Sequence, residues 1–570
     1  MDKADHVLNI DDTDNPAPPV AVASTANTLP RLQALKSQCN VVPMTSKSPI
    51  ASHTFLWHDY ETFGINTRRD RPAQFAAIRT DAALNEMGDP VMLYCQPAND
   101  FLPDPQSCLI TGITPQLCLE KGLPEYQFAA HIEQMLSQPG TIGVGYNTIR
   151  FDDEFTRFMF WRNLIDPYAR EWQNNCGRWD LMDVVRTAYA LRPEGIHWPI
   201  KLDENGDGKH DSKHDSKHDS KNGSKASFKL TDLTAANGLA HEAAHDALSD
   251  VRATIALARL LRDKQPRLFD FCLGLHKKDR VAAELGLPTT VASAKPFLHI
   301  SGMFPAERGC LALMWPLAMH PANKNELIAW DLAHDPRELA AMNVDEIRLR
   351  LFSRSDDLPD GMTRLPIKTI HLNKSPMVMS NLKVLSPAMT LRWGMDMETQ
   401  LANATLASGL PDMSGIWPEV FQRPQEATPD VDEDLYGGFI GNADRRRLNE
   451  LRGLSADKLA AKRNAFDDPR LEELVFRYRA RNFGASLTEQ EAVRWEAHRA
   501  AQLFNGESEG EGEAEGDGTG RDSGRPRTIE TLFAEIDALS AAADEREDDK
   551  ALEILGALYD YAEMIAPERL

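Results

Sequence analysis

Two acidic residues interrupt an apolar, strand-like stretch at residues 55–64, "FLWHDYETFG". Asp59 and Glu61 are separated by a single residue, so in a strand both carboxylates project from the same face. Two like charges side by side repel each other, and burying them is costly unless a cation compensates. The stretch therefore predicts a strand that carries part of a cation site, with further ligands supplied from elsewhere in the chain.

Length, charge and cysteine content limit the class of protein. A chain of 570 residues predicts two to four domains. It has no run of 18 or more apolar residues and no secretory signal at its acidic N-terminus, so we expect a cytoplasmic protein without a membrane span. Seven cysteines without a C-x-x-C pair indicate reduced thiols. The net charge of −23 argues only weakly against nucleic-acid binding, because phosphates are bound by a local patch.

Changes in composition predict four regions: a disordered extension at 1–50, an α/β domain at 54–262, a β-rich domain at 266–424 and a helical domain at 427–570. The insert at 204–226 repeats KHDS three times. Its His and Asp residues could bind metal, but a disordered surface insertion is favoured because no apolar residue docks it. The acidic, glycine-rich segment at 505–527 is likewise expected to be disordered.

Hydrophobic periodicity predicts the main elements. Strands are expected at 55–60, 73–81, 90–97 and 141–146, and shorter strand-like runs at 297–304, 309–320 and 325–333. Helices are expected at 125–138, 152–164, 180–191, 247–262, 443–463, 468–482, 487–504, 528–543 and 549–566.

Two later stretches supply the further acids. "YNTIRFDDEF" (146–155) offers Asp152, with Asp153 as a competitor, and "HEAAHDALSD" (241–250) offers His245 and Asp250. Each is common by itself, since an acid on an amphipathic helix usually faces water and a histidine before a helix is usually a cap. Their combination in one α/β unit is far more specific. Carboxylates without cysteine ligands suit Mg²⁺ or Mn²⁺ better than zinc.

The acids and the histidine occur in the order D-x-E, F-D and H-x-x-x-x-D. This order resembles the bacterial exonuclease I family, in the His-containing branch of the DEDD superfamily of 3′→5′ exonucleases. The resemblance is also carried by stretches such as "DRPAQFAAIRTD" (70–81), "RWDLMDV" (178–184), "ALRPEGI" (190–196) and "YRARNF" (478–483). The resemblance extends from about 55 to 566. It implies a ribonuclease H-like exonuclease domain, an SH3-like domain and an α-helical C-terminal domain. The implied activity releases 5′-mononucleotides from the 3′ end of single-stranded DNA in repair or recombination.

The resemblance also implies roles within a two-metal-ion site. Asp59 would bridge both ions, Glu61 and Asp250 would bind one of them, and Asp152 would bind the other or act in its outer shell. His245 would take the proton of the attacking water, from a loop that precedes the helix of Asp250.

Cationic and aromatic residues near the acids would hold the strand of DNA. The resemblance assigns substrate contacts to Glu61, Arg157, Tyr168, Trp172, Arg186 and Arg192, and to Lys229, where family members commonly have arginine. Phe158 and Trp161 are expected in the core. In "LVFRYRARNF" (474–483) the aromatic residues are expected in the core and Arg477, Arg479 and Arg481 along the DNA.

The resemblance further implies binding of the acidic tail of the single-stranded DNA-binding protein, in a basic groove that the sequence does not locate. We expect a monomer. The alternative functions are an RNA-trimming or proofreading exonuclease of the same superfamily and a non-catalytic single-strand-binding protein.

Overall fold

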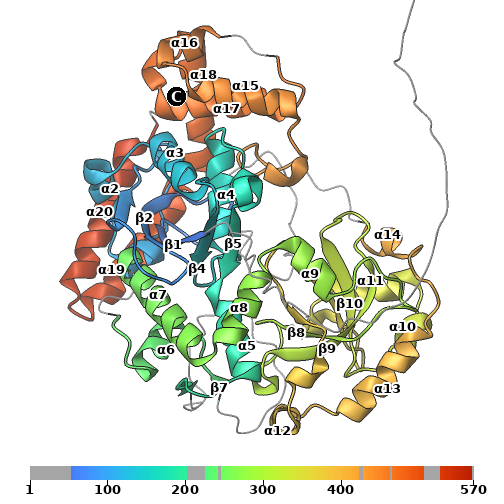
Figure 1. Ribbon diagram of the computed structural model, residues 1–570. Coiled ribbons are helices and arrows are strands. Elements are labelled where there is room, and N and C mark those ends of the chain that lie inside the picture. The colour runs from blue at the N-terminus through green and yellow to red at the C-terminus, as the bar shows by residue number, and fades with distance from the viewer. Residues whose placement is uncertain are drawn as a thin grey trace, which may run out of the picture. The chain divides into compact units, whose positions relative to one another are not determined.

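The computed structural model describes residues 53–201, 225–241, 246–422, 428–462, 465–505 and 527–567 (Figure 1). The predicted extension at 1–50, nearly all of the KHDS insert and most of the acidic segment lie outside these residues. The last two residues of the predicted insert are described, and they form a short strand, β7 (Lys225–Ala226), paired with β6 (Ile200–Lys201).

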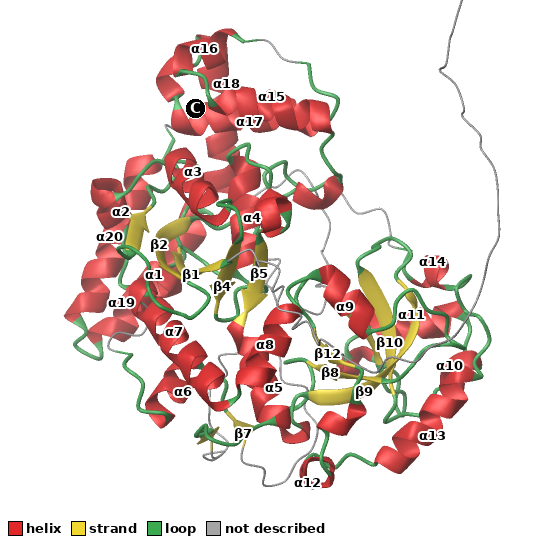
Figure 2. Ribbon diagram, in the orientation of Figure 1, coloured by secondary structure: helices red, strands yellow, loops and turns green. Residues whose placement is uncertain are grey.

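A five-stranded mixed sheet forms the centre of the first domain (Figure 2). Its strands are β1 (Thr54–Thr62), β2 (Pro72–Thr80), β3 (Val91–Tyr94), β4 (Thr141–Gly145) and β5 (Gly177–Asp180), in the order β3-β2-β1-β4-β5. Strands β1, β4 and β5 are mutually parallel, whereas β2 runs antiparallel to both β1 and β3. The four predicted strands are confirmed. β5 was not predicted, because its four residues, "GRWD", lead directly into a helix.

The helices of this domain are α1 (Pro105–Thr111), α2 (Pro115–Lys121), α3 (Glu125–Leu136), α4 (Asp152–Arg162), α5 (Leu181–Leu191), α6 (Leu230–Ala236) and α7 (Ala247–Lys264). The four predicted helices correspond to α3, α4, α5 and α7 and are confirmed. Helices α1 and α2 were not predicted. Each follows a side-chain cap, Asp104 or Thr114, and begins with a proline, which fits the first helical turn.

Alternation along β1 sends its side chains to opposite faces of the sheet. Phe55 and Trp57 join a core with α5 and α7, whereas Leu56 and Tyr60 join a core with α3 and α4. Asp59 and Glu61 continue the two-residue repeat of Phe55 and Trp57, so all four side chains point to the same face of the sheet. The strand therefore directs both acids to the face that α7 covers.

The middle region contains a second, fully antiparallel sheet in the order β11-β10-β9-β8-β12. Its strands are β8 (Phe297–Ile300), β9 (Leu311–Met319), β10 (Glu326–Asp331), β11 (Ile367–His371) and β12 (Met377–Met379). The three predicted strands, β8, β9 and β10, are confirmed, whereas β11 and β12 were missed. The helices here are α8 (Pro266–Gly274), α9 (Lys278–Glu284), α10 (Arg337–Ala340), α11 (Val344–Phe352), α12 (Pro387–Arg392), α13 (Met397–Ser408) and α14 (Trp417–Val420).

The last region is helical, as predicted. It contains α15 (Asn442–Arg452), α16 (Ala456–Ala461), α17 (Arg470–Asn482), α18 (Glu489–Ala500), a π-helical turn at Ala501–Asn505, α19 (Ile529–Asp544) and α20 (Asp549–Ile565). None of the helices within the described ranges is both long and apolar enough to cross a membrane. The six cysteines that the structure describes are buried and unpaired.

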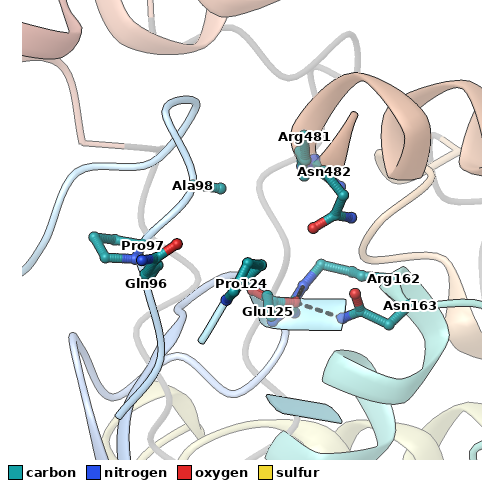
Figure 3. A pocket seen from close by; sticks show the side chains of 9 residues that line it. All are labelled: Gln96, Pro97, Ala98, Pro124, Glu125, Arg162, Asn163, Arg481 and Asn482. Atoms are coloured by element: carbon teal, nitrogen blue, oxygen red, sulfur yellow. Dashed lines mark hydrogen bonds and ion pairs between the residues drawn. The ribbon is translucent and has the colours of Figure 1, made fainter. Parts of the chain in front are cut away.

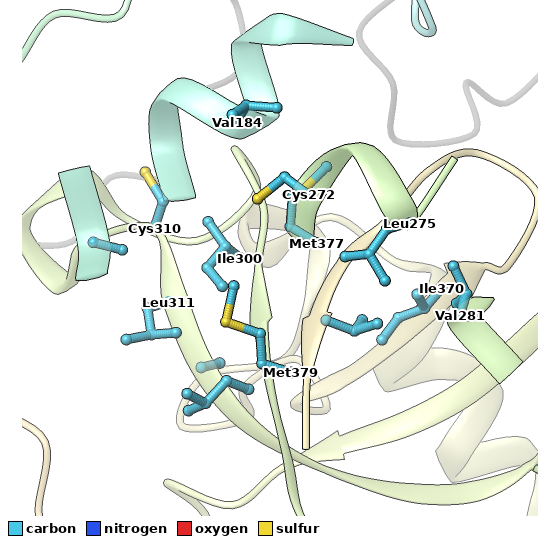
Figure 4. Packing of buried hydrophobic residues seen from close by; sticks show 14 of the residues in the cluster. Val184, Cys272, Leu275, Val281, Ile300, Cys310, Leu311, Ile370, Met377 and Met379 are labelled. Carbon is cyan, nitrogen blue, oxygen red and sulfur yellow. The ribbon is translucent and has the colours of Figure 1, made fainter. Parts of the chain in front are cut away.

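The buried clusters extend across the predicted domain borders. Val184 of α5 belongs to one apolar cluster with Ile300 and Met377 of the second sheet (Figure 4). Leu558 and Tyr561 of α20 belong to another cluster with Phe63 and Leu102 of the first domain. The Tyr561 hydroxyl also donates a hydrogen bond to the Ala98 carbonyl at 3.1 Å. The exonuclease domain therefore shares one buried cluster with the middle region and another with the last helix of the chain.

Replacing Leu558 with alanine should lower the free energy of unfolding by about 3 kcal/mol, because a fully buried leucine leaves a cavity. Thermal unfolding followed by circular dichroism measures this change. Met564→Ala on the same helix is the control, because Met564 is 62% exposed and its loss should have little effect. An undiminished midpoint for Leu558→Ala would contradict a shared core.

Candidate active site

Three carboxylates meet where β1 faces the start of α7. Asp59, Glu61 and Asp250 each offer one oxygen, and these three oxygens lie within 4.8 Å of one another. Asp250 lies in the first turn of α7, and Asp246 caps this helix by accepting a hydrogen bond from the Ser249 amide at 3.0 Å. The structure thus brings together three of the four predicted acids, and α7 aims Asp250 inward as the sequence analysis expected.

The fourth acid, Asp152, is buried at the first position of α4 and lies close enough to raise the pKa of both Asp59 and Glu61. Its competitor Asp153 points elsewhere. It forms buried ion pairs with Arg170 at 2.5 Å and with Arg178 at 3.2 Å. Burial alone would raise the pKa of Asp153, but the two guanidinium groups lower it to about 2. The neighbouring acids therefore have separate environments.

Asp59, Glu61 and Asp152 hold their protons more tightly than ordinary carboxyl groups. Burial, followed by the charges of Asp152, Glu61 and Asp250, raises the pKa of Asp59 well above its usual range. Burial and Asp250 raise the pKa of Glu61 to about 8, and burial and Asp153 raise that of Asp152 to about 8. Full ionisation of the cluster is unfavourable by itself, and a bound cation would offset this cost.

His245 lies outside the described residues, so its predicted place beside the acids stays a prediction. A different histidine, His241, is in contact with the cluster. Its Nε2 lies 2.5 Å from Asp250 Oδ1, and its Nδ1 lies 3.2 Å from Thr234 Oγ1 of α6. His241 was not among the predicted site residues, although it is in the same "HEAAHDALSD" stretch, because the H-x-x-x-x-D spacing to Asp250 selects His245.

Three predicted DNA-contacting arginines have partners within the protein. Arg157 is buried and pairs with Glu154 at 2.8 Å and Glu171 at 2.7 Å. Arg186 pairs with Asp183 at 2.7 Å. Arg192 donates a hydrogen bond to the Val384 carbonyl at 3.0 Å. These contacts restrict the arginines to fixed positions, and their role in substrate binding stays a prediction.

The other predicted contacts differ in exposure. Trp172 is 65% exposed, and Lys229 is exposed immediately before α6. Tyr168 is partly buried, with the Arg157 guanidinium 5.2 Å from the centre of its ring. Phe158 and Trp161 are buried in a cluster with α15 and α17, which confirms that they are core residues.

The expectation that the arginines of α17 line the DNA is wrong. Arg477 pairs with Asp430 at 2.6 Å, Arg479 pairs with Glu491, and Arg481 pairs with Asp100 at 2.7 Å. All three side chains are nearly buried, so the alternation of arginine and aromatic residues serves internal packing. Phe476 and Tyr478 are in the core as expected.

A small cavity of about 70 Å³ lies apart from the acids (Figure 3). It is lined by the segment 96–98, the start of α3, the end of α4 and the end of α17. Its charges are paired, with Glu125 accepting hydrogen bonds from Arg162 at 3.2 Å and Asn163 at 2.7 Å. None of the four acids of the site lines this cavity. It belongs to the junction between the first and last domains.

Comparison with known sequences identifies the three regions. Residues 56–226 match an exonuclease family, residues 276–423 match the exonuclease I SH3-like domain, and residues 429–516 match the exonuclease I C-terminal domain. Exodeoxyribonuclease I of Escherichia coli K12 is 41% identical over 515 residues, which cover 90% of this chain and 98% of that protein. The Haemophilus influenzae enzyme is 41% identical over 457 residues, or 80% and 91% of the two chains.

The chain belongs to the exodeoxyribonuclease I family. Its fold is similar to the solved exonuclease I of Methylocaldum szegediense, with a TM-score of 0.78 at 43% identity, covering 90% of this chain and 99% of that one. E. coli exonuclease I in complex with a dA16 oligonucleotide gives a TM-score of 0.76 at 39% identity, with coverage of 90% and 100%. The predicted fold class, a ribonuclease H-like exonuclease domain with an SH3-like domain and an α-helical C-terminal domain, is confirmed.

Divalent cations should stabilise this exonuclease more at about pH 8 than at about pH 5.5. The pKa values of Glu61 and Asp152 rise from 4.5 and 3.8 to about 8, so their contribution to the stability of the metal-free protein is lost as the pH rises towards 8. A cation must displace their protons at the lower pH, whereas at the higher pH a much larger fraction of these carboxyl groups is already ionised. Calorimetric unfolding with Mg²⁺ or EDTA measures the stabilisation at both pH values. At a cation concentration 100 times the Kd at pH 8, it should be about 2.7 kcal/mol at pH 8 and smaller at pH 5.5.

The variant Asp59→Asn is the control for this experiment and should respond weakly to the cation at either pH. Equal or greater stabilisation at about pH 5.5 would contradict the expected release of protons.

Proposed function

We propose that this protein degrades single-stranded DNA from its 3′ end and releases 5′-mononucleotides by two-metal-ion hydrolysis. The observation that carries the proposal is the group formed by Asp59, Glu61 and Asp250, with Asp152 beside it, in a chain of the exodeoxyribonuclease I family. E. coli exonuclease I, its relative, has been crystallised with single-stranded oligonucleotides, which supports the substrate class.

The chemistry of the donors fits a hard divalent cation. The carboxylate oxygens of Asp59, Glu61 and Asp250 lie within 4.8 Å of one another and match the preference of Mg²⁺ or Mn²⁺ for oxygen ligands. Asp59, Glu61, Asp250 and Asp152 would hold the ions. When bound, the ions would supply activation of water and stabilisation of the leaving 3′-oxygen.

The protein's own groups would orient the reactants. Asp59 and Glu61 are fixed by the strand, and α7 fixes Asp250, so the ligand oxygens need little rearrangement during the reaction. His245 would accept a proton from the attacking water, as the sequence analysis expects. Glu61 is also proposed to contact the terminal nucleotide.

Charged and aromatic side chains around the acids are proposed to hold the strand. Lys229 and Trp172 are the exposed members of the set and can reach phosphate and base without breaking an internal pair that the structure describes. Tyr168, Arg157, Arg186 and Arg192 are proposed to contribute from their fixed positions.

The physiological setting is also part of the proposal. We infer a cytoplasmic, nucleoid-associated monomer that acts in DNA repair or recombination. Its proposed protein partner is the single-stranded DNA-binding protein, through that partner's acidic C-terminal tail. A solved SSB/exonuclease I complex of a relative supports this pairing.

A 5′-labelled oligonucleotide incubated with Mg²⁺ or with EDTA tests the activity, with single-stranded DNA, duplex DNA and RNA in parallel. We expect progressive shortening of single-stranded DNA alone and only with the cation. Preference for RNA would support a ribonuclease instead. Binding without shortening would support a non-catalytic single-strand-binding protein.

Asp59→Asn and Asp250→Asn should each lower the cleavage rate at least about a hundredfold, because each removes a negative charge from the metal-binding group. Binding of single-stranded DNA should persist, as measured by fluorescence anisotropy. Asp263→Asn is the matched control, since Asp263 lies on the same helix with a side chain that is 72% exposed. Full activity of both cluster variants would mean that these acids are structural.

Lys229→Ala should weaken binding of single-stranded DNA and reduce the slope of log K against log salt by about 0.7, because one phosphate contact is lost. Anisotropy titrations in EDTA at several salt concentrations measure the slope without cleavage. Lys229→Arg keeps the charge and is the control, with a slope close to that of the original protein. An unchanged slope for Lys229→Ala would exclude a phosphate contact at this position.

A further inference from the structure

Asp180 is a buried carboxylate beside the active site that the proposed chemistry does not use. It is the last residue of β5 and caps α5, with Oδ1 accepting a hydrogen bond from the Met182 amide at 2.9 Å. The same oxygen accepts from the Asn147 amide at 3.0 Å, and Oδ2 accepts from the Ile149 amide at 3.1 Å. Only the bond to Met182 belongs to ordinary helix capping. The other two hydrogen bonds, from Asn147 and Ile149, hold a different segment of the chain.

That segment is the turn between β4 and α4, which leads to Asp152. Asn147 has a positive φ of 66°, so the chain reverses direction sharply there. The Asp153 amide donates to the Thr148 carbonyl at 2.8 Å, which joins the turn to the first residues of α4. A displacement of the turn would therefore move Asp152.

The end of β4, from which the turn begins, lies tightly against β1. A Cβ atom added at Gly145 would be 2.8 Å from the His58 carbonyl oxygen and 3.0 Å from the Thr148 Cβ, so glycine is required for this approach. His58 immediately precedes Asp59. The turn thus begins at a residue packed against β1, which carries Asp59, and its Asn147 and Ile149 amides are held by the carboxylate of Asp180.

The carboxylate of Asp180 is retained at an energetic cost. It is 4% exposed, and the ion pairs that the structure describes give it no cationic partner of its own. Burial and the charge of Asp183 raise its pKa to about 7. A serine or threonine could cap α5 without the cost of burying a charged group. Its side chain would be too short to accept hydrogen bonds from the Asn147 and Ile149 amides as well.

We propose that Asp180 is a positioning residue, which fixes the turn at 147–149 and thereby places Asp152 against Asp59 for cation binding. This inference rests on the proposed function. Loss of this support is expected to weaken cation affinity and cleavage about tenfold, the lower end of the effect seen when a partner of a metal ligand is removed.

Asp180→Asn tests the proposal because it keeps one acceptor oxygen but replaces the other with an N–H donor. The remaining oxygen can still cap α5, but the side chain can no longer accept hydrogen bonds from both the Asn147 and the Ile149 amides. Mn²⁺ binding by isothermal titration calorimetry should weaken about tenfold, and the Mg²⁺ concentration for half-maximal cleavage should rise similarly. Excess Mg²⁺ should restore much of the rate, with an unchanged KM for DNA.

Asp180→Ser is the second variant, and it preserves a helix cap if the asparagine variant folds poorly. Asp396→Asn is the matched control, because Asp396 caps α13 by accepting from the Thr399 amide at 3.1 Å and lies outside the exonuclease domain. Its cation affinity should equal that of the original protein.

Unchanged Mn²⁺ affinity in folded Asp180→Asn and Asp180→Ser would overturn the proposal. So would a loss of cleavage that follows only the loss of folded protein and that excess Mg²⁺ does not reverse. Failure of the proposed function is distinguishable, because the original protein itself would then cleave no single-stranded DNA with Mg²⁺.

Discussion

Repulsion among buried carboxylates is the constraint around which the exonuclease domain is arranged. Asp59, Glu61 and Asp152 have raised pKa values because burial and neighbouring acids disfavour their charged forms. Such a group can be maintained only if rigid surroundings prevent the side chains from turning away. A strand in the middle of the sheet, two helix starts and a tightly packed turn supply that rigidity. Once the acids are ionised, the same concentration of negative charge would attract a divalent cation.

The first turn of α4 shows how three adjacent acids acquire different properties. Asp152 lies close enough to Asp59 and Glu61 to raise their pKa values, whereas Asp153 is neutralised by arginines from the segment around β5. Glu154 accepts from Arg157 at 2.8 Å, from Lys374 of the SH3-like domain at 3.4 Å, and from the Tyr436 hydroxyl of the C-terminal domain. Groups from all three domains therefore meet two residues from Asp152. A change in domain arrangement would be transmitted directly to the helix that carries this acid.

The sequence could predict what periodicity and spacing determine. The acid pair on β1 and the inward direction of Asp250 followed from the two-residue and 3.6-residue repeats. Periodicity and spacing alone could not separate Asp152 from Asp153, because in the structure the difference depends on Arg170 and Arg178, and the choice of Asp152 came from the family resemblance. Strand β5 was missed because it has only four residues and leads directly into a helix. The positioning role of Asp180, the last residue of this strand, was missed with it. The arginines of α17 were also misjudged, since acidic partners as distant in sequence as Asp100 bury them.

Parallel pairing explains why these separate stretches meet at one place. Val144 of β4 lies opposite Trp57 of β1 and Trp179 of β5, so the carboxyl ends of the three strands lie along one edge of the sheet. Each strand places its polar residues just beyond this point: Asp59 on β1, the turn to Asp152 after β4, and Asp180 at the end of β5. Open α/β sheets commonly bind ligands at such an edge. The acids are therefore at the edge where the chain leaves the sheet, and the hydrogen bonds of Asp180 convert this shared edge into a fixed arrangement.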